Sequence, residues 1–162
     1  KINRMWKYDM LTQVLNRSGF FYCAETILQK IKEEKSNAFI IFLDIDGLKS
    51  VNDNLGHEIG DAFIAKIAGI LKEVVPKDCL IMRYGGDEFV VFGSCKQAGR
   101  MQRIAEDIKA AIKTADQKEN RSYHLAASLG CSLHKSYEMD NLNSLIELAD
   151  KKMYEEKKNK RR

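Results

Sequence analysis

The chain has 162 residues, of which 44% are hydrophobic and 31% are charged, and its formal net charge at pH 7 is +4. These values are typical of one globular domain, and the single proline argues against linkers or disordered stretches. No apolar run approaches the roughly 18 residues of a membrane span, and no signal-peptide pattern is present. We therefore expect a cytoplasmic segment without membrane contact, although the full-length protein can still be attached to a membrane.

Composition also bears on the metal-binding and nucleic-acid-binding classes. The four cysteines are widely spaced, form no C-x-x-C pair and have mostly apolar neighbours, which predicts reduced core thiols rather than a zinc site or disulfides. Much of the excess positive charge lies in residues 157–162, but no aromatic side chains are interleaved with it. Nucleic-acid binding is therefore disfavoured.

The N-terminal part predicts two helices. Residues 1–8 are expected to be the end of an upstream linker helix, because their apolar side chains fall at helical spacing. Ser18 is the expected cap of the next helix, whose apolar face continues to Ile31 ahead of a Lys/Glu-rich end.

A buried strand is predicted over residues 38–45, a continuous apolar run of the kind found in strands covered on both faces. A short polar helix or turn follows over residues 47–55. Residues 60–75 then form a strong amphipathic pattern, which Pro76 ends.

The second half predicts a β-hairpin around residues 85–89, then a helix over 96–118, a strand over 123–134 and a last helix over 142–158. Strands joined by a hairpin in the middle and by helices elsewhere predict an α+β fold. We expect a mainly antiparallel sheet with helices packed on it, built around a split β-α-β core. No internal repeat or second domain is evident.

The hairpin turn is the most informative segment, because it carries two acids after two glycines: Gly85, Gly86, Asp87 and Glu88. Glycines let a backbone adopt positive φ and let another molecule approach closely. The alternative is that the glycines only close the hairpin and that the acids are solvated turn residues.

Carboxylates are predicted to converge if the first strand lies beside this hairpin, since Asp44 ends that strand and Asp87 and Glu88 occupy the turn. Hard oxygen ligands gathered at strand ends bind Mg²⁺, which keeps waters and is shared with substrate phosphates. Such an arrangement suits phosphoryl or nucleotidyl transfer. Polar caps at strand ends are the alternative.

Cations are also available near these acids. Lys49 follows the first strand closely, and Lys157 and Arg161 are four residues apart on one face of the last helix if that helix continues. Cations beside a carboxylate cluster suit a polyphosphate. Neither G-x-x-x-x-G-K-[ST] nor G-x-G-x-x-G occurs, so the P-loop and Rossmann modes do not apply.

Five ordered segments resemble the motifs of the GGDEF domain of diguanylate cyclases. They are DMLTQVLNR at 9–17, FLDIDGLKSVND at 42–53, GHEIGD at 56–61, RYGGDEF at 83–89 and ADKKMYEEK at 149–157. The resemblance implies a catalytic domain over residues 9–162 with a nucleotidyl cyclase-like fold. It also implies condensation of two GTP molecules into cyclic di-GMP with release of pyrophosphate.

The resemblance further implies the metal and its ligands. Mg²⁺, with Mn²⁺ as an alternative, would be held by Asp44, the carbonyl of Ile45 and Asp87. Glu88 matches a residue that helps deprotonate the 3′-hydroxyl or binds metal. Arg83 would neutralise developing charge, or alternatively form a structural salt bridge to a neighbouring acid.

The remaining site residues carried over from the family contact the nucleotide. Asn52 and Asp61 would read the guanine edge, which offers donors that adenine lacks. His57 would contact the nucleotide or cap the long helix, and Leu48 would keep an apolar wall. The turn glycines and three cations would approach the phosphates: Gly85, Gly86, Lys49, Lys157 and Arg161.

One such domain binds one GTP, so catalysis is expected to need a homodimer, controlled by an upstream sensory or receiver domain. The isolated domain is expected to be largely monomeric. Two departures from the family remove an inhibitory product site: Pro76 and Cys79 stand where Arg and Asp are usual. Lys160 replaces the usual Gly. A catalytically silent GTP-binding module is the alternative function.

Overall fold

The computed structural model describes residues 6–119, 122–135 and 141–161. Four strands form one sheet in the order β2-β3-β1-β4: β1 (Asn37–Ile45), β2 (Leu80–Arg83), β3 (Glu88–Cys95) and β4 (Ala127–His134). All three neighbouring pairs are antiparallel. The predicted α+β class with an antiparallel sheet is confirmed.

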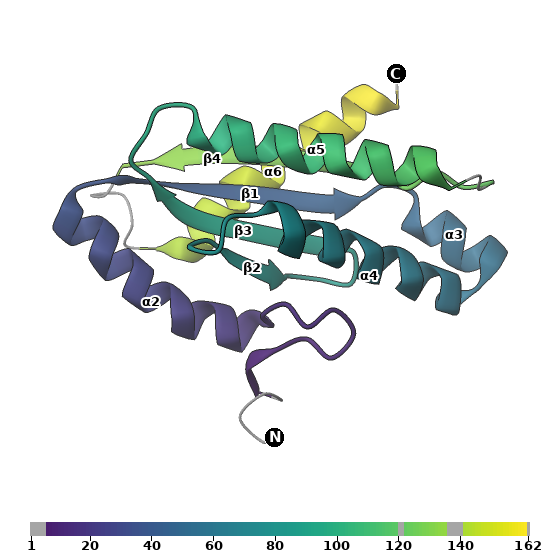
Figure 1. Ribbon diagram of the computed structural model, residues 1–162, viewed down its shortest axis with the longest axis horizontal. Helices are drawn as coiled ribbons and strands as arrows, with labels where there is room; N and C mark the ends of the chain where they lie inside the picture. The colour runs from purple at the N-terminus through teal and green to yellow at the C-terminus, as the bar shows by residue number, and fades with distance from the viewer. Residues whose placement is uncertain (1–5, 120–121, 136–140, 162) are drawn as a thin grey trace.

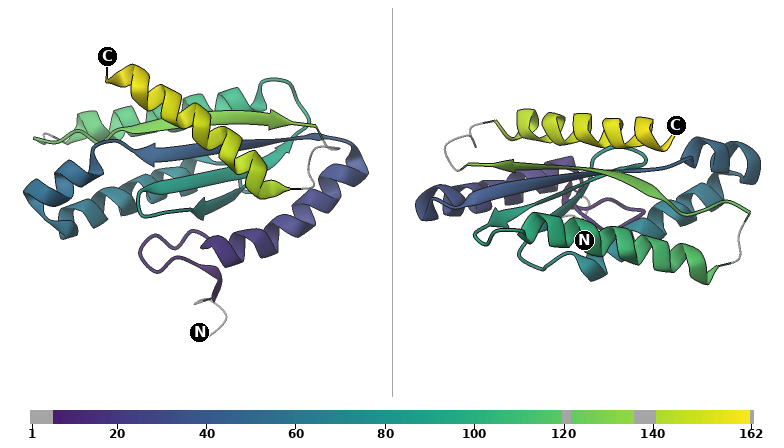
Figure 2. Two further views of the ribbon diagram at one scale, coloured as in Figure 1. Left: turned by 180° about the vertical axis from the view of Figure 1, so that it is seen from behind. Right: turned by 90° about the horizontal axis from the view of Figure 1, so that it is seen from above.

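Helices cover both faces of this sheet (Figures 1 and 2). One face carries α4 (His57–Val74) and α5 (Arg100–Lys118), and the other carries α2 (Arg17–Glu34) and α6 (Leu142–Lys160). Because side chains alternate along a strand, β1 sends Phe39 and Ile41 to the first face and Ile40 and Phe42 to the second. This double cover explains why β1 is a continuous apolar run.

A short helix, α3 (Leu48–Leu55), lies between β1 and α4. Gly56 joins the two helices with φ of 92°, a backbone conformation that side chains other than glycine rarely adopt. That bend lets α4 begin at His57, three residues before the predicted start. In Figure 1, α3, the end of β1 and the β2–β3 turn lie at the same end of the sheet.

Other boundaries also differ from the prediction. Asn16, not Ser18, caps α2, and its side chain accepts a hydrogen bond from the Gly19 amide at 2.8 Å. The helix predicted from residue 96 begins at Arg100 as α5, after Gly99 with φ of 85°. The strand predicted from residue 123 begins at Ala127 as β4. Leu125 donates instead to Asp116 of α5, at 2.7 Å.

The predicted upstream helix over residues 1–8 falls largely outside the described residues, which begin at Trp6. Tyr8 forms an antiparallel bridge with Leu15, and Leu15 forms a parallel bridge with Met82 of β2. The segment that leads into α2 is therefore attached to the edge of the sheet beside the hairpin.

All four cysteines are free thiols, as predicted. Cys79 and Cys95 are buried, whereas Cys23 and Cys131 are half-buried. Within the described ranges, no helix combines the length and the apolar character that crossing a bilayer requires.

Candidate active site

The three predicted carboxylates do come together at the end of the sheet. Asp44 pairs with Glu88 in the β1–β3 register, and the Ile45 amide donates to the Asp87 carbonyl at 3.0 Å. Strand pairing thus brings the end of β1 against the β2–β3 turn, although more than forty residues separate them in sequence. The conditional prediction that these acids converge is confirmed.

Lys157 of α6 places a cation against two of the predicted metal ligands. Its Nζ lies 3.3 Å from Asp44 Oδ1 and 3.4 Å from the Ile45 carbonyl oxygen. The Asp44 oxygen is buried and makes no well-aligned hydrogen bond, so the contact with Lys157 is an ion pair of imperfect geometry. Hard oxygens that already face one cation have the donor chemistry that Mg²⁺ prefers.

The electrostatics of this cluster oppose full ionisation. Burial raises the pKa of Asp44 to about 7, with the neighbouring charge of Asp87 acting in the same direction and Lys157 opposing it. Burial also raises the pKa of Glu88, as do the charges of Asp87 and Asp150. Like charges held together in this way are relieved when a cation binds.

The cluster is an incomplete metal site by itself. Within the described part of the chain, no three acidic, histidine or cysteine side chains are arranged so that they could hold a metal ion. Mg²⁺ commonly takes only one or two carboxylates and completes its shell with water and phosphate oxygens. The donors present therefore fit an ion that arrives with a nucleotide better than a permanently caged ion.

A close contact explains only one of the two turn glycines, and a positive φ angle explains neither. Neither Gly85 nor Gly86 is among the residues with positive φ. A Cβ at Gly85 would lie 2.2 Å from Glu88 Oε1, whereas a Cβ at Gly86 would meet nothing within 4 Å. Gly85 thus leaves room for the Glu88 carboxylate, and Gly86 leaves the surface of the turn bare.

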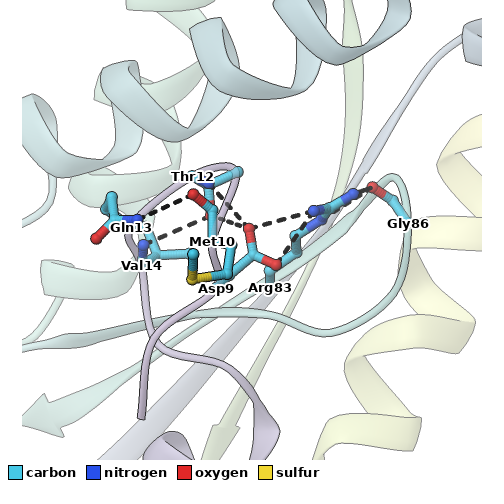
Figure 3. Close-up of polar contacts among 7 residues, drawn as sticks. All are labelled: Asp9, Met10, Thr12, Gln13, Val14, Arg83 and Gly86. Atoms are coloured by element: carbon cyan, nitrogen blue, oxygen red, sulfur yellow. Dashed lines mark hydrogen bonds and ion pairs between the residues drawn. The ribbon is translucent and has the colours of Figure 1, made fainter. Parts of the chain in front are cut away.

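The Asp9–Arg83 ion pair supports the turn from the N-terminal segment (Figure 3). Arg83 Nη1 lies 3.2 Å from both Asp9 carboxylate oxygens, and Nη2 donates to the Gly86 carbonyl at 2.8 Å. Thr12 also donates to Asp9, from its amide at 2.9 Å and from its hydroxyl at 2.7 Å. This is the structural salt bridge that stood as the alternative to a charge-neutralising role for Arg83.

The predicted guanine-reading residues lie on α3 and at the start of α4. Asn52 Oδ1 is buried and has no hydrogen-bond partner in the structure. It lies so close to Gly60 that a Cβ there would be 1.7 Å away, so any larger residue at position 60 would displace the Asn52 side chain. His57 and Asp61 are exposed on the first turns of α4.

Of the other predicted contacts, Leu48 is buried in the core with 7% of its surface exposed. Lys49, next to it, is exposed on α3. Arg161 is exposed after the end of α6 and lines a small hollow together with Lys157, Lys160, Asp46 and Gly47. Arg161 and Lys157 therefore share one hollow at the end of α6, whereas Lys49 lies on a separate helix.

Sequence reasoning missed the partners of Asp46. Ser128 Oγ donates to Asp46 Oδ1 at 2.8 Å, and Lys160 Nζ lies 2.9 Å from Oδ2. From the sequence, Lys160 is recognisable only as a departure from the family, which usually has Gly at this position. Its unusual identity at that position was the one available signal.

Pro76 and Cys79, the positions that correspond to the family's inhibitory product site, lie in a turn after α4. The Cys79 amide donates to the Pro76 carbonyl at 3.0 Å, and burial raises the pKa of the Cys79 thiol to about 11. Asp78 pairs with Arg100 of α5 at 2.7 Å. Absence of tight product binding at this site stays a prediction.

Comparisons with known proteins agree with the motifs. The family model described as "Diguanylate cyclase, GGDEF domain" matches residues 6–162. "Diguanylate cyclase VdcA" of Vibrio cholerae is 31% identical over 159 residues, covering 97% of this chain and 46% of that protein. "Diguanylate cyclase A" of Treponema denticola is 29% identical over 157 residues, covering 94% of this chain and 42% of that protein.

Among solved structures, the fold is similar to the coiled coil and GGDEF domain of DgcB from Caulobacter crescentus in complex with c-di-GMP. The TM-score is 0.86 at 25% identity, and the match covers 98% of this chain and 84% of that one. The chain spans less than half the length of the two curated relatives.

Proposed function

The chain belongs to the diguanylate cyclase GGDEF domain family, and from that premise we propose that it is a competent cyclase domain that condenses two GTP molecules into cyclic di-GMP. In each half-reaction the 3′-oxygen of one GTP attacks the α-phosphorus of the other, and pyrophosphate leaves. Two such steps close the ring.

The observation that carries the proposal is the convergence of Asp44, Asp87 and Glu88 at the end of the sheet. Burial, with the neighbouring charge of Asp87 acting in the same direction, raises the pKa of Asp44 to about 7. A carboxylate whose surroundings disfavour its charged form destabilises the native state when it ionises, so folding alone does not account for it. Such clusters are common at functional sites because a bound cation relieves them. A cyclase needs that cation together with its triphosphate.

Asp44, Asp87 and the Ile45 carbonyl would hold Mg²⁺, or Mn²⁺ as an alternative. The ion, when bound, would supply Lewis-acid stabilisation of the phosphoryl oxygens and of the attacking hydroxyl. Glu88 lies in the same cluster with a raised pKa, which suits a group that accepts the proton of the 3′-hydroxyl.

Asn52 and Asp61 select guanine. The Asp61 carboxylate accepts from the ring and amino N–H groups of guanine, and Asn52, whose Oδ1 is buried without a partner, offers a further acceptor. Adenine would leave such acceptors unpaired, which is a strong basis for discrimination. His57 lies beside them on α4, and Leu48 supports the wall from the core.

The triphosphate lies between the turn and the end of α6. Gly85 and Gly86 bring main chain close to it, and Lys49, Lys157 and Arg161 balance its charge. Arg83 positions the turn through its bonds to the Gly86 carbonyl and to Asp9.

Catalysis requires a homodimer, because each domain binds one GTP and the second nucleotide must come from a partner. The chain covers less than half of its curated relatives, so an upstream sensory or receiver domain is the proposed source of dimerisation control. We place the domain in the cytoplasm, where GTP is available.

A catalytically silent GTP-binding module is the second candidate. One observation favours it: Lys157 already lies against Asp44 and the Ile45 carbonyl, so the chain satisfies part of the cluster without a metal. Retention of all three carboxylates favours the cyclase.

Forced dimerisation separates the two candidates. The domain fused to a dimeric coiled coil is incubated with GTP, with ATP and with both, in Mg²⁺ or Mn²⁺, and products are identified by mass spectrometry. Cyclic di-GMP from GTP alone is expected, and a Glu88→Gln fusion is the matched control. GTP binding without any cyclic dinucleotide would favour the silent module instead.

A further inference from the structure

The last turn of α6 is tied to the ends of two strands. Lys160, the last residue of the helix, places Nζ 2.9 Å from Asp46 Oδ2 and 2.7 Å from the Ala127 carbonyl oxygen. Ser128 Oγ donates to the other Asp46 oxygen at 2.8 Å, and the Asp46 amide donates to the Ala126 carbonyl at 2.8 Å. These contacts, which we call the C-terminal clamp, join the end of β1, the start of β4 and the end of α6.

A hollow of about 160 Å³ lies beside the clamp, lined by Asp46, Gly47, Lys157, Lys160 and Arg161. Since one water takes about 30 Å³ in the liquid, the hollow has room for a group larger than water, such as a phosphate. Three of the lining side chains are cationic. The one carboxylate among them has both oxygens bonded by Ser128 and Lys160.

Three cations share this end of α6 because of helical spacing. Lys157, Lys160 and Arg161 stand at positions i, i+3 and i+4, which lie on one face of a helix. The helix runs through Lys160, and Arg161 keeps helical dihedral angles with its amide 3.2 Å from the Lys158 carbonyl. Helix ends fray without tertiary contacts, and the clamp supplies such a contact at the last residue.

From these contacts we infer that Lys160 is a positioning residue: it stays paired with Asp46 and holds Lys157 and Arg161 where they meet the terminal phosphates of a nucleoside triphosphate. The inference rests on the proposed function. Under this inference, Lys160 increases the preference of the domain for a triphosphate over a monophosphate, although its own side chain does not contact the phosphates. If Lys160 left Asp46 to contact the phosphate, Asp46 would keep the Ser128 hydrogen bond and the more distant Lys157 Nζ at 3.8 Å, but it would lose its closest cation and stand beside an anion.

The test compares nucleotides that differ only in phosphate number. Calorimetry in Mg²⁺ measures 3′-deoxy-GTP and 3′-deoxy-GMP, which cannot be cyclised, against the wild-type domain and Lys160→Met. We expect the variant to bind the triphosphate about tenfold more weakly and the monophosphate within about twofold. Lys160→Arg should restore the wild-type ratio, because it keeps the charge that pairs with Asp46.

Asp46→Asn distinguishes positioning from direct contact. If Lys160 positions its neighbours, loss of its anchor weakens triphosphate binding as Lys160→Met does, and the double variant is no weaker than either single one. If Lys160 instead binds phosphate directly, Asp46→Asn releases its charge and tightens triphosphate binding. Tighter binding would overturn the inference.

Lys158→Met is the matched control. Lys158 is in the same last turn, but its Nζ lies over the Tyr154 ring, 5.1 Å from the centroid. Lys158→Met should leave the ratio of triphosphate to monophosphate affinity unchanged. If Lys158→Met and Lys160→Met weakened triphosphate binding equally, the effect would be one of net charge, and the inference would be contradicted. Wild-type protein that binds neither nucleotide would defeat the proposed function as well. A wild-type preference for triphosphate that Lys160→Met leaves intact would defeat only the inference.

Discussion

Asp44 and Asp46 stand two residues apart at the end of β1, yet their surroundings are opposite. Asp46 has hydrogen bonds or ion pairs on both oxygens, from Ser128 at 2.8 Å and Lys160 at 2.9 Å. Asp44 Oδ1 is buried without a well-aligned hydrogen bond and lies 3.3 Å from Lys157 Nζ. Burial, together with the charge of Asp87, still raises the pKa of Asp44 to about 7. The same residue type therefore joins elements of the scaffold at one position, and at the other it occupies surroundings that disfavour its charged form.

The largest expected effect is on the cyclase rate, and it comes from replacing Asp44. Asp44→Asn in the dimerised fusion should lower cyclic di-GMP formation about a thousandfold or more, because several kcal/mol of transition-state stabilisation would be lost with the metal ligand. Asp107→Asn, at an exposed position on α5, is the control and should retain the wild-type rate. An Asp44→Asn fusion with more than about a tenth of that rate would contradict the assignment of Asp44 as a ligand.

The substitutions Asp44→Asn and Asp46→Asn should change the free energy of unfolding in opposite directions. In EDTA at pH 8, Asp44→Asn should raise the free energy of unfolding by about 2 kcal/mol, because it removes a buried charge next to Asp87. Asp46→Asn should lower it by about 1 to 2 kcal/mol, since it weakens a charge-assisted pair with Lys160. Urea unfolding measures both, and two changes of the same sign would break the contrast.

The sheet that positions this pair could be predicted from the sequence. The apolar run of β1 and the two runs that flank the glycine turn carry a strong strand signal, because each is a short apolar run bounded by turn residues. Once they are neighbours, Asp44 and Glu88 must meet. Two of the boundaries that were predicted wrongly, the starts of α4 and α5, follow Gly56 and Gly99, which have positive φ. Hydrophobic periodicity does not report that property.

The charge partners could not be predicted in the same way. Lys160 and Asp46 are 114 residues apart, and Arg83 and Asp9 are 74 apart. Their pairing depends on how α6 and the N-terminal segment dock on the sheet, which no local pattern encodes. Local sequence pattern therefore does not distinguish Asp44 from Asp46. The family resemblance singles out Asp44, and the structure adds the partners that make their surroundings differ.

A smaller effect separates positioning from direct catalysis at Arg83. If Arg83 acts by holding the turn, Arg83→Gln and Asp9→Asn should each lower the cyclase rate about tenfold, and the double variant should resemble either single one. If Arg83 acts on developing charge, Asp9→Asn would stay within about twofold while Arg83→Gln falls much further. Rates of the dimerised fusions at saturating GTP decide between these outcomes.

The smallest expected effect is the contribution of Asp9 to the pH dependence of stability. Like Asp46, Asp9 accepts hydrogen bonds and pairs with a cation. Burial alone would raise the pKa of Asp9, but the hydrogen bonds from Thr12 and the charge of Arg83 outweigh it and lower the pKa below 3.8. The unfolded chain then binds more protons than the native protein, so stability rises with pH. This contribution is complete above the unfolded pKa, near 4, and is lost as the pH falls through the native pKa.

Asp44 should show the reverse slope, because its raised native pKa makes the native protein bind the extra proton between about pH 4 and pH 7. Urea unfolding of metal-free wild type, Asp9→Asn and Asp44→Asn at a series of pH values isolates each contribution as a difference between curves. Asp9→Asn should converge with wild type towards pH 3 and lie below it by up to about 1 kcal/mol at pH 6, a modest value for a partly exposed pair. The free energy of unfolding of Asp44→Asn should increase relative to that of wild type as the pH rises to 7. Parallel curves for either variant would mean that its carboxylate has the same pKa in the folded and unfolded chain, and the contrast between satisfied and unsatisfied acids would fail at that position.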